Sequence, residues 1–139
     1  MTLYEYIDLL VQLKSAGNTI WGFLLSVGLG VVAFVSTVGK KFDKMYFIIL
    51  LIIIGVFSVS NNNALNKNIT ARYELGCQLS VEYNDYYNDN KAFVNTLSPM
   101  GKHKYFTHLY VRKAVLVFHR LLILLIISAV VIAYCKNNE

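Results

Sequence analysis

The sequence predicts an all-α integral membrane protein, on the basis of its composition, its clustered apolar residues and their helical spacing. Hydrophobic residues make up 56% of the 139 residues and charged residues only 15%. Globular proteins are typically about 45–50% apolar and about 25% charged, so both values indicate a lipid environment. The apolar residues are also clustered, since residues 121–127 contain no polar side chain. The length is sufficient for a single small membrane domain.

The N-terminal segment is predicted to form an amphipathic helix over residues 2–15. Thr2 and Glu5 have the spacing of a capping box, which satisfies backbone N–H groups at a helix start. One side of the helix would carry Leu3, Tyr6, Ile7, Leu10 and Leu13, and the other Glu5, Asp8 and Gln12. Ser15-Ala16-Gly17-Asn18 weakens the helix, so the amphipathic part (residues 1–17) is expected to end there. The segment lacks the basic start and cleavage site of a signal peptide.

Three apolar segments are expected to cross the membrane. The first covers about residues 19–38 and the second about 45–60, and the polar turn between them allows only an antiparallel hairpin. About 20 residues of helix are needed to cross a hydrocarbon core of about 30 Å, so the second segment is short. The third span covers about residues 115–135.

Residues 61–114 are predicted to form a helical region outside the lipid. Leu65, Ile69 and Tyr73 fall on one helical line, so the second helix is expected to continue toward Tyr87. Asn88-Asp89-Asn90 and then residues 97–101 supply helix breakers. No Pro or Gly interrupts residues 102–135, which predicts one long helix that contains the third span. The second and third membrane helices would therefore extend from the bilayer as a hairpin.

Small residues recur every fourth position in the first span, at Gly22, Ser26 and Gly30. Such a line allows two helix backbones to approach closely in lipid, where no hydrophobic force drives association. It predicts either a self-association face for a homo-oligomer or packing against the other spans of the same chain. The sequence leaves both interpretations open.

Basic residues occur where the third span enters the lipid. Because this span needs residues 115–118 to reach sufficient length, Arg120 would lie inside the hydrocarbon boundary, at a cost of up to about 2.5–3.5 kcal/mol. Lys113 shares a helical face with Arg120, and Arg112 and His119 share the neighbouring face. In an oligomer these four residues would form basic rings that favour anions at a pore mouth. The alternative is an Arg120 side chain that reaches to the lipid headgroups.

Further basic residues precede this group on the same helix: Lys102, His103, Lys104 and His108. They are candidates for a surface that binds a phosphate-bearing ligand such as a nucleotide or nucleic acid. A solvated charged helix is the alternative.

Other kinds of chemistry find little support in the sequence. The histidines and the two cysteines, Cys77 and Cys135, have no metal-ligand spacing, so we expect free thiols, no metal and no cofactor. No catalytic motif is present, and we expect no enzyme.

In topology and size the chain resembles the small pore-forming effectors of bacterial antiphage systems, such as SLATT-type hairpin proteins and the channel components of Hailong-type operons. The shared features are an amphipathic N-terminal helix, a membrane hairpin and a helical region outside the lipid, and the third span is additional to the SLATT pattern. The resemblance implies a homo-oligomeric channel or membrane-perturbing effector of antiviral defence, gated by a ligand. The alternative is a non-conducting interaction protein, such as an immunity, exclusion or accessory subunit that binds a second membrane protein.

The distribution of Lys and Arg predicts the orientation in the inner membrane. Nine of these residues lie on the side that holds Lys14 and residues 61–114, counting Arg120, and four lie on the other side, at Lys40, Lys41, Lys44 and Lys136. Because positive residues stay in the cytoplasm, the central region should be cytoplasmic and Glu139 external. In a Cys-free background, an impermeant thiol reagent added to intact cells should label Glu139→Cys and not Asn88→Cys. Labelling of Asn88→Cys from outside would reverse the assignment.

Overall fold

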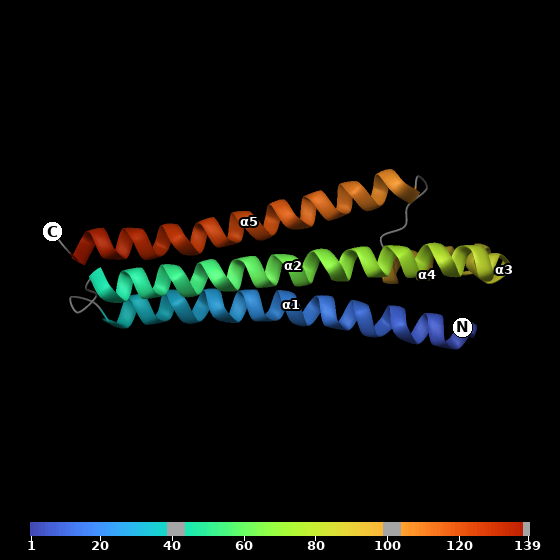
Figure 1. Cartoon of the computed structure of the whole chain (residues 1–139), viewed down its shortest axis with the longest axis horizontal. Helices are drawn as coiled ribbons and strands as arrows, with labels where there is room; N and C mark the ends of the chain where they lie inside the picture. Colours follow the sequence, from blue (N-terminus) through green and yellow to red (C-terminus); the bar gives the residue numbers. More distant parts are fainter. Residues whose placement is uncertain (39–43, 99–103, 138–139) are drawn as a thin grey trace.

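Five helices make up the part of the chain that the computed structural model describes, which is residues 1–38, 44–98 and 104–137. Side chains are described for these residues except 38, 104–108 and 137. The helices are α1 (Leu3–Val38), α2 (Lys44–Glu82), α3 (Asn84–Asp89), α4 (Lys91–Leu97) and α5 (Lys104–Asn137), and the described residues contain no strand. The long helices α1, α2 and α5 lie side by side, and α3 and α4 lie near the end of the molecule that holds the N-terminus (Figure 1).

The prediction of an all-α membrane protein is confirmed. Helices α1, α2 and α5 each contain a segment that is long and apolar enough to cross a membrane. A helix suits this environment because it satisfies its backbone N–H and C=O groups internally, where lipid offers no hydrogen-bond partner. The apolar segments of the three helices pack against one another, so they lie at the same end of the bundle.

Helix α1 is continuous from Leu3 to Val38, and the weak helix formers at residues 15–18 do not separate its amphipathic part from the first span. The reason is the packing of α1 on α2. Gly17 is buried there, and a Cβ atom added to it would lie 2.9 Å from Oδ1 of Asn68. Nδ2 of Asn68 donates a hydrogen bond of 2.7 Å to the carbonyl of Leu13. Gly17 lowers the helix propensity by about 1 kcal/mol relative to Ala. In return, the absence of a side chain at Gly17 permits this close approach of the two helices.

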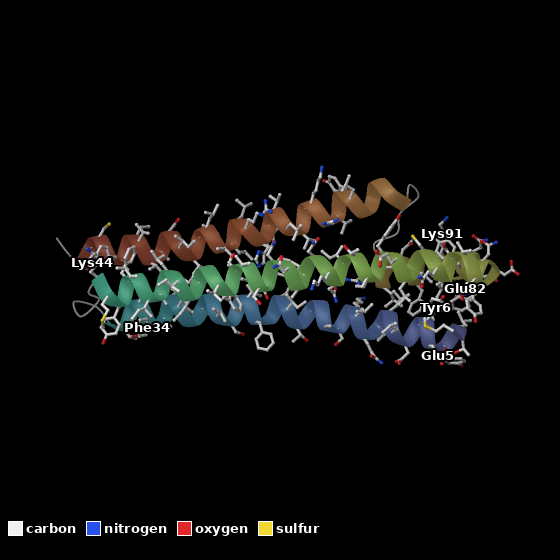
Figure 2. The ribbon with its side chains drawn as sticks, in the orientation of Figure 1. Glu5, Tyr6, Phe34, Lys44, Glu82 and Lys91 are labelled. Carbon is white, nitrogen blue, oxygen red and sulfur yellow. The ribbon has the colours of Figure 1, made fainter. Side chains whose placement is uncertain are left out.

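The start of α1 forms the predicted capping box and is attached to the end of α2. The backbone N–H of Thr2 donates to Glu5 Oε2 at 2.6 Å, and the N–H of Glu5 donates to Thr2 Oγ1 at 3.3 Å. The hydroxyl of Tyr6 donates to Glu82, and this bond raises the pKa of Tyr6 to about 12. Tyr6 and Glu82 lie at the same end of the molecule in Figure 2. The hydroxyl of Tyr83 donates to the Met1 carbonyl at 2.8 Å.

The second membrane helix continues beyond its apolar segment, as predicted, but it ends at Glu82 rather than near Tyr87. The predicted breakers lie at helix ends, since α3 ends at Asp89 and α4 ends at Leu97. The short helices α3 and α4 were not predicted, because six or seven residues are too few for a clear periodic signal. The predicted long helix from Lys102 is confirmed as α5 within the described residues.

Two separate clusters of buried apolar side chains hold the bundle together, and both are built on α1 and α2. The first lies outside the lipid and adds residues of α3 and α4; its buried members are Tyr6, Leu10, Leu75, Leu79, Tyr87, Val94 and Leu97. The second lies among the membrane segments and adds residues of α5; its buried members are Leu24, Val31, Val35, Leu50, Ile54, Ile123 and Val130. The polar residues between the two clusters form the region of interest for function.

Candidate functional site

A buried polar pair joins α2 to α5 at the level where the apolar sequence of α2 ends. Nδ2 of Asn61 and Nε2 of His119 lie 3.0 Å apart. The side chain of His119 is fully buried and that of Asn61 is 8% exposed. The other ring nitrogen of His119, Nδ1, is buried and has no hydrogen-bond partner among the described residues. Polar groups in such a position connect helices, because the alternative is an unsatisfied polar group in an apolar setting.

Trp21 of α1 covers this pair. Its ring lies 6.2 Å from that of His119 in an edge arrangement and 5.8 Å from that of Phe118. Tryptophan is enriched at the boundary between lipid and water, where an apolar ring with one polar N–H is well accommodated. Asn61, His119 and Trp21 therefore mark one level across all three helices, and we take this level as the edge of the hydrocarbon region.

The four basic residues predicted at a pore mouth fall into different environments. Arg120 and Lys113 are exposed on the surface of α5, and Arg112 is partly buried. His119 is enclosed within the chain. Successive helical residues point about 100° apart, so the burial of His119 directs Arg120 away from the core. The structure therefore separates His119 from Arg120 and leaves Arg120 and Lys113 available to headgroups or another subunit.

The small-residue line of α1 faces away from the bundle. Gly22, Ser26 and Gly30 are exposed, and a Cβ atom added at either glycine would meet no atom within 4 Å. At Gly28, by contrast, an added Cβ would lie 2.8 Å from Cδ1 of Ile126. Within the described part of the chain, the close contact between α1 and α5 uses Gly28, whereas a side chain at Gly22 or Gly30 would point away from the other helices.

The candidate phosphate-binding surface is only partly covered by the structure. Lys102 and His103 lie outside the described residues, and Lys104 and His108 lie in the first turns of α5, where the backbone alone is described. Elsewhere, the described residues contain no group of three or more His, Cys, Asp or Glu side chains arranged to hold a metal ion. Cys77 and Cys135 are free thiols, as predicted.

The sequence analysis missed a second polar site, which lies about two to three helical turns beyond Asn61 on α2. Asn68 and Arg72 of α2 line a cavity of about 130 Å³ together with Asn18 and Trp21 of α1. A signal for it was present, because Asn61, Leu65, Asn68 and Arg72 follow one another at spacings of four, three and four residues. Such spacing places them on one helical face.

No known protein family, curated protein or solved structure matches this chain.

The Asn61–His119 pair should show strong coupling when each residue is replaced. We expect Asn61→Leu or His119→Leu alone to destabilise the protein by about 1–3 kcal/mol, because each leaves a buried polar partner unsatisfied. The double variant should be less destabilised than the sum of the two single variants. Thermal unfolding in detergent micelles measures this, with the exposed Ser128→Leu as the control for an added leucine on α5. Additive effects would show that the two side chains do not interact.

Proposed function

We propose that the protein is a homo-oligomeric, non-enzymatic membrane channel that favours anions and whose subunits associate through the small-residue face of α1. The observation that carries this proposal is the outward orientation of Gly22, Ser26 and Gly30. Glycine in a membrane helix gives up side-chain contacts, and this loss is compensated where a second helix packs closely against the backbone. No helix within the described part of the chain occupies that position, so a second copy is the simplest partner.

The arrangement of apolar side chains within one chain supports conduction between subunits rather than through a subunit. The apolar cluster among the membrane segments fills the space between α1, α2 and α5 at the level of the lipid. Its members include Val130, Leu24 and Ile54, which are each at most 2% exposed. A pathway for ions would therefore lie on an axis shared by several chains. Arg120 and Lys113, which are exposed on α5, would supply its positive charge.

The same proposal places the protein in the bacterial inner membrane, with α3 and α4 in the cytoplasm, as the distribution of Lys and Arg indicates. The resemblance in size and topology to antiphage effectors supports a role in antiviral defence. A phosphate-bearing ligand that binds near the start of α5 would be the gating signal, since residues 102–108 carry four basic or histidine side chains.

Replacement of the outward-facing glycines should weaken the oligomer and leave the single chain folded. Leucine at Gly22 or Gly30 would hold two α1 helices several ångströms further apart and remove their close packing. Mass photometry or cross-linking in lipid nanodiscs should then show smaller assemblies for Gly22→Leu and Gly30→Leu. Gly55→Leu is a matched control, because Gly55 of α2 is also exposed and has no atom near its Cβ position. Unchanged assemblies for all three variants would exclude α1 as the interface.

Charge at Arg120 should determine ion selectivity if it lines a pore mouth. Several copies around an axis would raise the local anion concentration, so Arg120→Glu should reduce or reverse the anion preference and Arg120→Gln should weaken it. Reversal potentials under a chloride gradient in planar bilayers measure this preference. Lys91→Glu serves as the control, because exposed Lys91 lies on α4 at the end of the molecule away from the membrane segments (Figure 2).

Two results would contradict the conduction proposal. If Arg120 reaches headgroups instead, both substitutions change insertion or stability and leave selectivity unaltered. If the purified protein conducts nothing, with or without nucleotide ligands, the non-conducting interaction protein becomes the better interpretation, and the α1 face would then bind a second membrane protein.

A further inference from the structure

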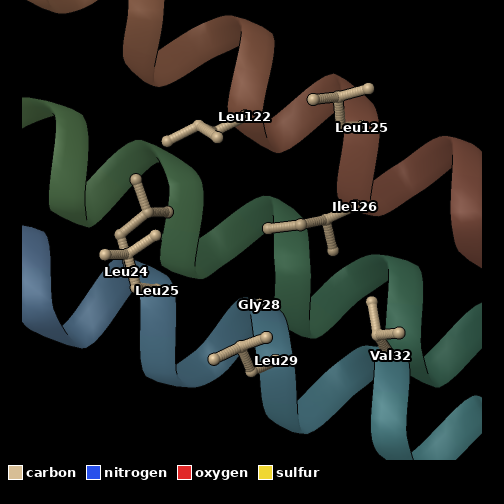
Figure 3. Close-up of a pocket in the computed structure, with 8 residues that line it drawn as sticks. All are labelled: Leu24, Leu25, Gly28, Leu29, Val32, Leu122, Leu125 and Ile126. Atoms are coloured by element: carbon tan, nitrogen blue, oxygen red, sulfur yellow. The ribbon is translucent and has the colours of Figure 1, made fainter.

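A polar cavity and an apolar groove follow one another along the line where α1 faces α5. The cavity described above lies on the side of Trp21 that is further from the lipid. The groove has a volume of about 210 Å³ and lies on the other side of Trp21, between residues 24–32 of α1 and residues 122–126 of α5. Figure 3 shows Leu25 and Leu29 of α1 on one side of the groove and Leu122, Leu125 and Ile126 of α5 on the other.

The cavity contains a hydrogen-bond acceptor without a donor. Asn68 is 7% exposed and lines the cavity, and its Nδ2 donates to the carbonyl of Leu13 at 2.7 Å. Its Oδ1 is buried and has no hydrogen-bond partner in the part of the chain that is described. A buried acceptor left in this state loses its hydration without compensation, so a ligand that brings an N–H or O–H group would be favoured.

The cavity also contains a cation without an anion. Nε of the half-buried Arg72 donates to the carbonyl of Leu97 at 2.6 Å. Its Nη1 points toward α1 and lies 3.9 Å from the position that a Cβ atom of Gly17 would occupy. Over the described ranges, residues 1–37, 44–98 and 109–136, no acidic side chain forms an ion pair with Arg72. A guanidinium group in this state binds phosphate oxygens well, because its fork of N–H donors matches their geometry.

The cavity lies at the depth of lipid headgroups. Gly17 precedes Trp21 by four residues, which corresponds to about 6 Å along the helix axis. A headgroup layer extends about 5–7 Å beyond the hydrocarbon core on each side. The side chain of Arg72 projects toward the N-terminal, membrane end of α2, as helical Cα–Cβ bonds do. The groove between Leu24 and Val32 covers about 12 Å of α1, most of the thickness of about 15 Å of one leaflet's hydrocarbon.

We propose that this line between α1 and α5 is a binding site for one phospholipid of the adjacent leaflet. The phosphate pairs with the guanidinium of Arg72, and an ammonium or hydroxyl group of the headgroup donates to Oδ1 of Asn68. One acyl chain crosses the ring of Trp21 and lies in the groove over the contact of Gly28 with Ile126, against Leu25 and Leu29 of α1 and Leu122 and Leu125 of α5. A free phosphate ion would satisfy Arg72 alone and leave the groove empty, which is why a lipid is the better occupant. This site does not depend on conduction or on the oligomeric state.

Native mass spectrometry of the full-length protein in detergent tests the site through the lipids that the protein retains. Phosphatidylethanolamine and phosphatidylglycerol should be retained, because each has a phosphate and a hydrogen-bond donor. Phosphatidylcholine lacks the donor and should bind more weakly, and diacylglycerol lacks the phosphate and should be lost. Arg72→Gln should weaken retention by about tenfold or more, as expected for a charged hydrogen bond. Lys67→Gln, which removes an exposed charge from the same helix, should have no effect.

A second pair of variants keeps the test decisive if Arg72→Gln fails to fold. Val111 lines the cavity, so Val111→Phe should fill it and exclude the lipid. Val117→Phe makes the same change at a position of α5 that is 53% exposed, and it should retain the lipid. Equal retention by these two variants would overturn the proposal. So would protection against thermal unfolding by inorganic phosphate equal to that given by phosphatidylglycerol, since the site would then bind a soluble anion.

Discussion

The packing of α1 against α2 along their full length is the contact on which the rest of the molecule depends. Both apolar clusters are built on these two helices, whereas α5 joins only the cluster in the lipid and α3 and α4 join only the cluster outside it. The contact is close where buried Gly17 meets Asn68. The packing at Gly17 stabilises α1 through a segment of weak helix formers. As a result, the predicted surface helix and the first span form one continuous helix.

The forces that stabilise the helix bundle change along its length. Outside the lipid, side chains such as Leu10 and Leu79 are removed from water, and the hydrophobic effect favours their burial. Between the membrane segments there is no such driving force, so close packing and hydrogen bonds between helices take its place. The contact of Gly28 with Ile126 and the Asn61–His119 pair are contacts of this second kind. The two regimes meet near Trp21, and the buried Asn61, Asn68 and His119 lie within about two helical turns of that level.

The two arginines near this boundary are accommodated in opposite ways. Arg72 extends toward the lipid inside the bundle, beside the unsatisfied oxygen of Asn68, whereas Arg120 lies outside the bundle on α5. An internal cation of this kind favours a bound anion, and an external one is available to headgroups, a neighbouring subunit or an ion pathway. The proposed lipid site and the proposed channel therefore use different surfaces of one chain. A lipid between α1 and α5 would also stabilise the position of α5, the helix that carries Arg120.

The sequence by itself determined the class of the protein, its three membrane segments, the capping box at Thr2 and Glu5, and the long uninterrupted α5. These features follow from composition, apolar periodicity and local hydrogen bonding, which depend on residues close together in the chain. Only the tertiary structure decided that α1 is continuous, that Gly22 and Gly30 face outward while Gly28 faces α5, and that Asn68 and Arg72 share a cavity. Each of these depends on which face of a helix meets another helix. In a span that is apolar on all sides, the helical period does not distinguish its faces, so the partner helix decides which face is buried.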